Sequence, residues 1–266
     1  MNKHHADGGE LAAHNLALAG RLTAITAALR PGEVTAICGP NGAGKSTLLA
    51  CLAGLLQAGS GTVTLDAMPL ANLAPRARAR AIGYLPQSPE IAWDVSVETL
   101  VSLGRIPWRG VPLSQDQLAI DAAIAAMDLE PLRHRPVSRL SGGERARALM
   151  ARVLATAPRW LLADEPLANL DLAHSAQLIV RLRQQAGQGT GVVLVLHDLA
   201  QAMNHADRVL VLADGRLVAG GPPELALSEE MIARVWAVTA HWLGEPGARA
   251  LAVGQGAGWT RLTPPR

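Results

Sequence analysis

A glycine-rich segment at residues 39–47, GPNGAGKST, constrains the fold of this chain more than any other feature. An apolar run typical of a strand, residues 33–38, precedes it, and a helical run, residues 45–56, follows it. The spacing fits G-x-x-x-x-G-K-[ST], in which glycines let successive backbone N–H groups turn inward and the next helix adds its positive N-terminus. We therefore predict a phosphate-binding loop for a nucleoside triphosphate. The predicted loop consists of Gly39, Pro40, Asn41, Gly42, Ala43, Gly44, Lys45, Ser46 and Thr47.

The chemistry of this loop depends on its last residues and on two acids further along the chain. Lys45 is expected to place its cation on the β- and γ-phosphates, and Ser46 to offer its hydroxyl to Mg²⁺. Asp164 follows a second apolar strand, residues 159–163, and fits the acid that holds Mg²⁺ in P-loop enzymes. Glu165 beside it is suited to polarise a water molecule for in-line attack as a general base. The alternative is an exposed acidic turn before Pro166.

The alternation of apolar strands and helical stretches predicts an α/β fold with a mostly parallel sheet around a P-loop NTPase core. A third buried strand, residues 192–196, ends in His197 and Asp198. Because ligands bind at the carboxyl ends of strands in such sheets, three strand ends are expected to converge on one site.

We predict a single domain in which helices interrupt the α/β core. Strand patterns disappear between Gln87 and Ser141, so we expect an inserted helical subdomain over about 88–150. The core then covers about 10–87, with an N-terminal antiparallel β portion, and 151–230. A C-terminal tail over 231–266 is rich in Gly, Ala and Pro from Gly244 onward and is expected to be irregular there.

Composition and charge exclude several classes of protein. A net charge of +2 with interspersed acids and bases gives no electrostatic case for a nucleic-acid partner. No apolar run is long enough to span a bilayer, and the first ten residues lack the apolar region of a signal peptide, so we expect a soluble cytosolic chain. Cys38 and Cys51 are expected to be small core residues rather than a disulfide, and the histidines lack the spacing of a zinc site.

A second anion-binding helix start is predicted at residues 140–144, LSGGE, here called the signature segment. A serine and two glycines before a helix over 144–154 form such a start, although alone they could be an ordinary helix cap. Together with the phosphate loop, this segment makes the chain resemble the ATP-binding-cassette (ABC) ATPases. The resemblance implies that ATP is the nucleotide and that a second copy of the chain pairs head to tail. It also implies that Ser141, Gly142 and Gly143 reach the γ-phosphate bound by that second copy.

The resemblance assigns three more segments over about residues 10–230. Gln87 matches a glutamine that contacts Mg²⁺ and water and senses the membrane partner. Residues 168–171 (ANLD) match a loop whose acid, Asp171, lies at the dimer interface. His197 matches a histidine that contacts the γ-phosphate, although a lone histidine of this kind is more often a core residue.

One stretch departs from the family pattern. Family members usually place an aromatic side chain upstream of the first core strand, where it stacks on adenine. Residues 15–30 (NLALAGRLTAITAALR) contain no Tyr, Phe or Trp. We therefore expect the adenine to be held loosely, by apolar contact alone.

The branch of the family is indicated by residues 81–108, which resemble the ATPases of iron–siderophore, haem and vitamin-B12 importers. The implied partners are polytopic permease subunits and, indirectly, a substrate-binding protein, with the chain peripheral on the cytoplasmic face of the inner membrane. Trp93 and Trp108 are expected either to line a groove for a permease helix or merely to pack the helical insertion. The alternatives are an exporter or lipid-transport ATPase, or a non-transport ABC ATPase.

Overall fold

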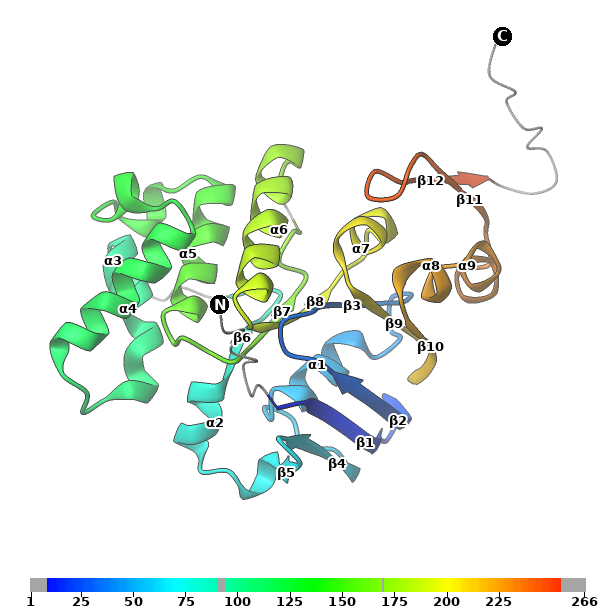
Figure 1. Ribbon diagram of the computed structural model, residues 1–266, viewed down its shortest axis with the longest axis horizontal. Helices are drawn as coiled ribbons and strands as arrows, with labels where there is room; N and C mark the ends of the chain where they lie inside the picture. Colours follow the sequence, from blue (N-terminus) through cyan, green and yellow to red (C-terminus); the bar gives the residue numbers. More distant parts are fainter. Residues whose placement is uncertain (1–8, 90–93, 169, 255–266) are drawn as a thin grey trace, which may run out of the picture.

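A six-stranded sheet forms the centre of the molecule in the computed structural model, which describes residues 9–89, 94–168 and 170–254 (Figure 1). Five neighbouring strands run parallel and the sixth, at one edge, is antiparallel to its neighbour. In spatial order they are β6 (Ile82–Leu85), β7 (Trp160–Asp164), β8 (Gly191–Val195), β3 (Val34–Cys38), β9 (Arg208–Ala213) and β10 (Arg216–Gly221). The predicted α/β fold with a mostly parallel sheet is confirmed.

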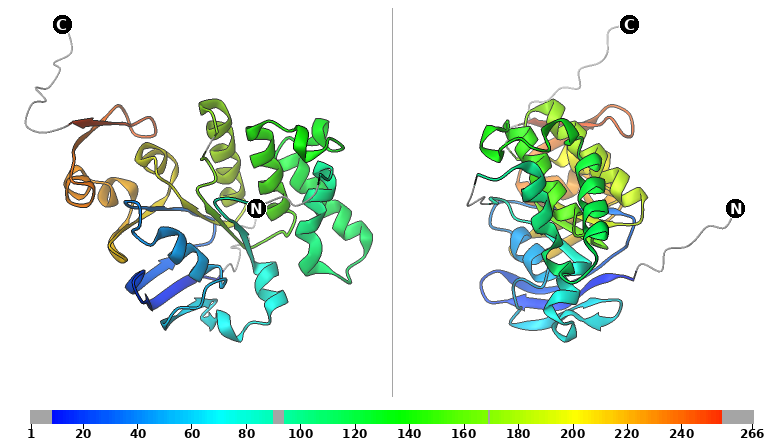
Figure 2. Two further views of the ribbon diagram at one scale, coloured as in Figure 1. Left: turned by 180° about the vertical axis from the view of Figure 1, so that it is seen from behind. Right: turned by 90° about the vertical axis from the view of Figure 1, so that its left-hand side faces the viewer.

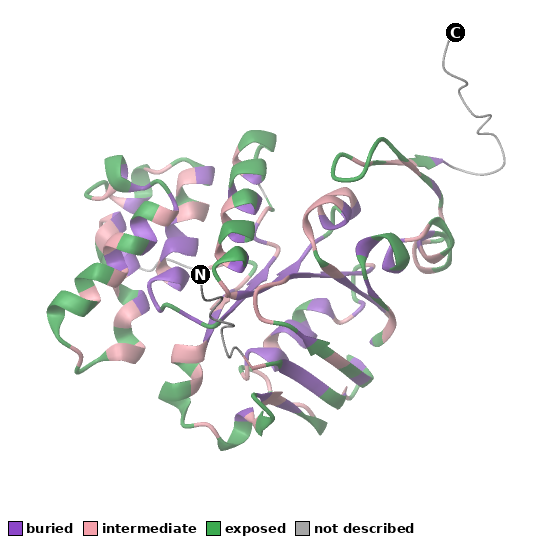
Figure 3. Cartoon of the chain, in the orientation of Figure 1, coloured by how far each residue is buried: buried purple, intermediate pink, exposed green. Residues whose placement is uncertain are grey.

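The central strands are buried on both faces, as Figure 3 shows, because helices cover each side. Along β8, Val193 and Val195 face a core shared with α1 (Lys45–Leu52). Val192 and Leu194 face the opposite core, which contains α6 (Leu172–Gly187) and α7 (Leu199–His205). The period of two in strand side chains therefore assigns each residue to one core or the other.

A second, antiparallel sheet packs against α1 on the side away from the central sheet (Figures 1 and 2). Its strands are β2 (Leu22–Leu29), β1 (Leu11–Leu18), β4 (Ser60–Leu65) and β5 (Met68–Pro69), in that order. This is the predicted N-terminal antiparallel portion. The 3-10 helix η1 (Leu70–Asn72) and α2 (Pro75–Ala81) then lead back to β6.

Every described element between β6 and β7 is helical, and together these elements form one lobe of the molecule (Figure 1). The elements are α3 (Val97–Ser102), η2 (Leu103–Trp108), α4 (Leu113–Ala126), η3 (Glu130–Leu132), η4 (Val137–Arg139) and α5 (Gly142–Leu154). Arg133 ties three of them together, because its guanidinium binds carboxylates of Glu98, Asp121 and Glu130 at 2.8–2.9 Å. No helix among the described residues is long and apolar enough to cross a membrane.

The C-terminal part is more ordered than the sequence predicts. After α8 (Pro223–Ala226) and α9 (Glu229–Trp236), β11 (Thr239–Leu243) and β12 (Ala250–Gly254) pair as an antiparallel hairpin. Asn204 on α7 exchanges two 2.8 Å hydrogen bonds with the backbone of Arg249. The prediction of an irregular chain from Gly244 onward is therefore wrong for residues 250–254, because pairing with β11 supplies order that local composition does not indicate.

The first helix is shorter than predicted. We expected it to continue to residue 56, but α1 ends at Leu52. Gly54 takes a left-handed φ of 66°, and the backbone N–H of Leu55 bonds back to the carbonyl of Ala50 at 2.9 Å. A left-handed glycine with such a bond is a common helix stop, and here it outweighs the helix-favouring Leu55 and Leu56.

Candidate functional site

The predicted phosphate loop connects β3 to α1 through three glycines that no larger residue could replace without strain. Gly39, Gly42 and Gly44 have φ values of 152°, 79° and 95°. A Cβ on Gly39 would lie 2.2 Å from the carbonyl oxygen of Leu212, and one on Gly44 would lie 2.7 Å from that of Arg21. The glycines thus allow the loop to pass close to neighbouring backbone, as the sequence predicts.

The Lys45 ammonium lies inside this loop. Its Nζ donates hydrogen bonds of 2.9 Å to the carbonyl oxygens of Gly39 and Pro40, and the residue is only 5% exposed. Burial lowers the pKa of Lys45, and the nearby carboxylate of Glu165 acts in the opposite direction. A buried cation therefore lies within the loop that the sequence predicts for phosphate binding.

Ser46 and Asp164 meet beside the loop. Ser46 is the second residue of α1, and Asp164 is the last residue of β7. The Ser46 hydroxyl donates to Oδ1 of Asp164 at 3.1 Å. Asp164 is 4% exposed, and burial raises the pKa of its carboxyl group, while the Ser46 hydrogen bond lowers it. A hydroxyl and a carboxylate are oxygen ligands of the kind that Mg²⁺ prefers.

The ends of β6, β7 and β8 meet at the carboxylate of Glu165. Oε1 of Glu165 lies 2.5 Å from Nε2 of His197, and Oε2 accepts a 2.8 Å hydrogen bond from Nε2 of Gln87. Glu165 has a left-handed φ of 51°, a conformation that costs a non-glycine residue free energy and that is concentrated at functional sites. The fold therefore brings Glu165, His197 and Gln87 together. The convergence of strand ends predicts that Glu165 and His197 lie close together, whereas Gln87 was assigned by the family resemblance alone.

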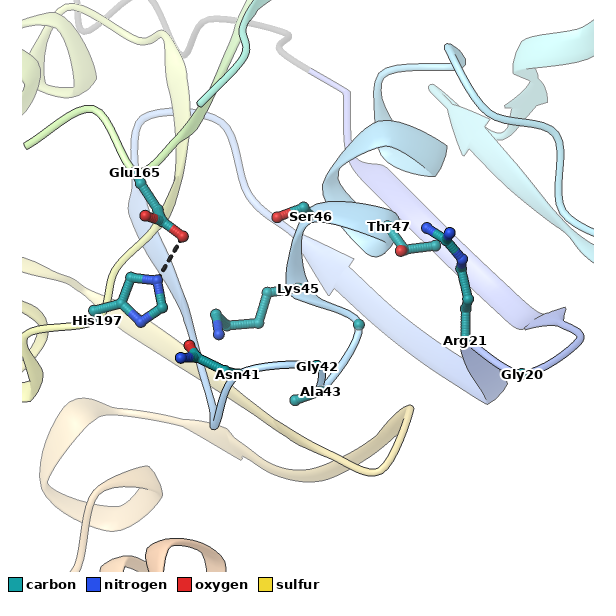
Figure 4. A pocket seen from close by; sticks show the side chains of 11 residues that line it. Gly20, Arg21, Asn41, Gly42, Ala43, Lys45, Ser46, Thr47, Glu165 and His197 are labelled. Atoms are coloured by element: carbon teal, nitrogen blue, oxygen red, sulfur yellow. Dashed lines mark hydrogen bonds and ion pairs between the residues drawn. The ribbon is translucent and has the colours of Figure 1, made fainter. Parts of the chain in front are cut away.

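A cavity of about 370 Å³ opens over the phosphate loop (Figure 4). Glu165 and His197 line one end, and Gly20 and Arg21, from the turn between β1 and β2, line the other with Thr47. Arg21 is a site residue that the sequence analysis missed. No local pattern marks it, because only packing of the antiparallel sheet on α1 brings that turn to the loop.

The signature segment lies outside the lining of this cavity. Ser141 is the N-cap of α5: its Oγ accepts from the backbone N–H of Glu144, whose carboxylate accepts from the backbone N–H of Ser141. Ser141 and Gly142 are exposed. Ser141 therefore has the ordinary helix-capping role that the sequence analysis gave as the alternative. Because Ser141 and Gly142 are exposed, the start of α5 is also accessible to another molecule.

His174 packs against the start of α5. The sequence analysis did not predict this contact. A Cβ on Gly143 would lie 2.5 Å from the His174 ring, so only glycine allows this approach. Nδ1 of His174 lies 2.8 Å from both carboxylate oxygens of Asp171, which caps α6. The backbone N–H of His174, which donates to Oδ1 of Asp171 at 2.8 Å, lowers the pKa of Asp171 most, and the ring contact lowers it further. Within one chain, His174 thus connects Asp171, the last residue of the ANLD loop, to the signature segment. Asn169 of that loop lies outside the described residues.

The two cysteines and Trp108 have packing roles. Cys38 and Cys51 are buried free thiols in the two different cores, as predicted for small core residues. The Trp108 ring lies under the guanidinium groups of Arg80 and Arg105, 4.3 and 5.0 Å from its centroid, and its Nε1 donates to the Thr156 carbonyl oxygen at 2.8 Å. Trp108 therefore packs the helical lobe, while Trp93 lies outside the described residues.

The site combines a phosphate loop, a buried lysine and two acids at the end of a strand in a parallel sheet. These features define a P-loop nucleoside triphosphatase.

Comparison with known proteins identifies the family within this class. The family model described as "ABC transporter" matches residues 22–168. The hemin import ATP-binding protein HmuV of Streptomyces coelicolor is 42% identical over 93% of this chain and 89% of its own length. HmuV of Rhodococcus jostii is 44% identical over 80% of this chain and 73% of its own length.

Solved structures agree with this likeness. CbiO1 from Clostridium perfringens, part of the ABC transporter complex cbiONQ, matches with a TM-score of 0.76 and 28% identity, over 86% of this chain and 94% of that one. An ABC transporter described as metal-chelate type, in an inward-facing conformation, matches with a TM-score of 0.79 and 25% identity, over 92% of this chain and 97% of that one. The chain belongs to the ABC transporter family, and it is an ATP-binding and ATP-hydrolysing member.

Proposed function

We propose that this chain is the ATP-hydrolysing subunit of an importer for haem or a closely related iron chelate. The observation that carries the catalytic part is the meeting of Gln87 and His197 at the carboxylate of Glu165, which lines the cavity over the phosphate loop together with His197. The cargo is supported by the likeness, at above 40% identity, to proteins named for hemin import. It is also supported by the likeness to a metal-chelate type transporter.

Bound ATP would place its phosphates within the loop of residues 39–47. Lys45 would then exchange its two carbonyl partners for β- and γ-phosphate oxygens, which are stronger acceptors because they are charged. The oxygens of Ser46, Asp164 and Gln87 suit Mg²⁺, and the Ser46–Asp164 hydrogen bond holds two of these ligands together. When bound, Mg²⁺ would neutralise charge on the β- and γ-phosphates.

Glu165 would accept the proton of the attacking water. Its carboxylate is mostly shielded from solvent, with 14% of the side chain exposed, and its two hydrogen-bond partners fix its orientation. His197 would steady the γ-phosphate, and Gln87 would link the site to the helical lobe that begins after β6. Each of these roles needs the three side chains on one side of the loop, where the fold places them.

A second copy of the chain would complete the site. The capping box occupies the N–H groups of Ser141 and Glu144, so the N–H groups of Gly142 and Gly143 are the ones suited to a γ-phosphate. This helix start does not line the cavity of its own chain. A head-to-tail pair would bring Ser141, Gly142 and Gly143 of one copy to the phosphate loop of the other.

Subunit mixing tests this arrangement. Lys45→Ala chains and Ser141→Arg chains are each expected to be inactive alone, yet their mixture should recover activity through one intact composite site. A mixture as inactive as its components would contradict the shared site. A Ser138→Arg chain, changed at another exposed serine of the lobe, serves as the control for the added charge.

A permease helix would dock at the junction of β6 and the helical lobe. A groove of about 410 Å³ there is lined by Tyr84, Leu103, Ile106 and Pro107, among others. Leu103 and Ile106 are 39% and 50% exposed and line the same groove, so together they offer an apolar surface that a partner helix could cover. Because β6 leads directly to Gln87, such a helix would respond to events at the nucleotide. The chain would then lie on the cytoplasmic face of the inner membrane, and a substrate-binding protein would act through the permease.

The transport role is tested with the chain reconstituted in vesicles together with its permease. We expect haem uptake that requires hydrolysable ATP and is lost with Ile106→Asp, while the ATPase activity of the isolated chain persists. Uptake of another metal chelate in place of haem would correct the cargo, and export in the same assay would contradict the importer assignment. Leu113→Asp, at a more exposed apolar residue outside the groove, is the matched control.

A further inference from the structure

The turn between β1 and β2 is fixed against the phosphate loop by its backbone. The carbonyl oxygen of Arg21 would lie 2.7 Å from a Cβ on Gly44 and 2.6 Å from one on Gly215, so two glycines with positive φ enclose it. Arg21 also donates its N–H to the Leu18 carbonyl oxygen at 2.9 Å, and the Thr23 N–H bonds to the Gly215 carbonyl oxygen at 2.8 Å. The position of Arg21 at the cavity is therefore set by backbone contacts on both sides.

The two ends of the cavity differ in chemistry, and this difference gives the nucleotide a direction (Figure 4). Hydrolysis by Glu165 requires the γ-phosphate at the end lined by Glu165 and His197. The α-phosphate, ribose and base must then extend toward the opposite end, which is lined by Gly20, Arg21 and Thr47. Arg21 is the one charged side chain among the described residues lining that opposite end.

The Arg21 side chain is free to meet a ligand. It is exposed, and it forms no ion pair or side-chain hydrogen bond with another described residue. The described lining of the cavity includes no Tyr, Phe or Trp that could stack on a base. A guanidinium group is planar, weakly hydrated and stacks on aromatic rings, so it can replace an aromatic side chain as a stacking surface.

On these grounds, and resting on the proposed ATPase function, we propose that Arg21 holds the nucleotide base by stacking its guanidinium plane on the purine ring. This changes the expectation drawn from residues 15–30, that the base is held by apolar contact alone. The competing role for the same side chain is that of a point charge on the α-phosphate. A stacking role requires a ligand that contains a base, whereas a charge on the α-phosphate requires only phosphates. The two roles also differ in which substitutions of Arg21 restore binding.

Binding of MgATP and of magnesium tripolyphosphate, which has no base, separates these roles in the full-length chain. We expect Arg21→Ala to weaken MgATP binding roughly 5- to 10-fold, as loss of a stacking contact does, and to leave tripolyphosphate binding unchanged. Arg21→Trp should restore MgATP binding because it supplies a stacking plane. Arg21→Lys should not, because it supplies charge without a plane. Arg30→Ala, at the far end of β2, removes the same charge at a distance from the cavity and should change neither affinity.

Two results would overturn the inference. Equal weakening of both ligands by Arg21→Ala, with rescue by Arg21→Lys, would make Arg21 a phosphate contact. Unchanged affinity for both ligands would remove it from the site. Thermal unfolding of each variant without ligand shows that the turn still folds. If the unaltered chain bound neither ligand, the proposed ATPase function itself would fail. That outcome is distinct from a failure of the Arg21 proposal, because the Arg21 proposal is tested only by differences between the variants and the unaltered chain.

Discussion

Replacement of Glu165 by Gln is the most direct test of the catalytic site. The amide has nearly the same shape as the carboxylate, and its oxygen can still accept a hydrogen bond from Gln87 or His197, so the surrounding geometry should persist. It cannot take up a proton at neutral pH. Glu165→Gln therefore removes general-base function while changing little else in the site.

The size of the effect follows from the position of the carboxylate. Positioned general bases contribute about 10²–10⁴-fold to rate, which corresponds to about 3–5 kcal/mol of activation free energy. Because the Glu165 side chain is only 14% exposed and held by two partners, bulk water cannot readily replace it, and we expect a loss toward the upper end of that range. The affinity for ATP should stay the same or increase, since one negative charge near the triphosphate is removed.

Steady-state phosphate release at saturating MgATP gives the rate, and calorimetric titration gives the affinity. Glu230→Gln, at an exposed carboxylate on α9, makes the same chemical change away from the site and should leave both quantities unchanged. If Glu165→Gln kept more than about a tenth of the wild-type rate, the carboxylate would not be the base. A large loss of ATP affinity would instead mean that Glu165 mainly supports the binding geometry.

Two further predictions concern the core. Gly191→Ala should lower the free energy of unfolding by about 1–3 kcal/mol, because its Cβ would lie 2.4 Å from the rigid, fully buried ring of Trp160. Thermal unfolding should show the loss, whereas the control Gly187→Ala, at the end of α6 where the added Cβ meets open space, should not lower stability. Burial raises the pKa of Cys38 to about 12 and also raises the pKa of Cys51, so burial makes both thiols harder to deprotonate. A colorimetric thiol assay at pH 8 should detect neither in the native protein and both in denaturant; a fast-reacting native thiol would contradict the packing.

Much of the candidate site could be predicted because its signals are local. The phosphate loop is a continuous pattern, and Asp164, Glu165 and His197 each follow an apolar run that had to be a buried strand. Because ligands bind at the carboxyl ends of parallel strands, these residues were predicted to lie together. Gln87 was found through family resemblance, since β6 is a short strand with a weak pattern of its own.

The C-terminal hairpin shows where local reasoning failed. Residues 250–254 become a strand only because β11 pairs with them and Asn204 bonds to the chain just before them. Alanine and glycine, which have little strand preference, make up three of these five residues, so the conformation of this stretch depends on partners elsewhere in the chain.

The phosphate loop was therefore determined by the sequence alone, since nine consecutive residues and their flanking strand and helix contain all the backbone geometry that it needs. The tertiary structure decided what surrounds the loop. It brought Arg21 to one end of the cavity through packing of a separate sheet, set His174 against Gly143, and left the start of α5 outside the cavity of its own chain. These placements depend on contacts between segments far apart in the chain, and such contacts leave no periodic or spacing signal in the sequence.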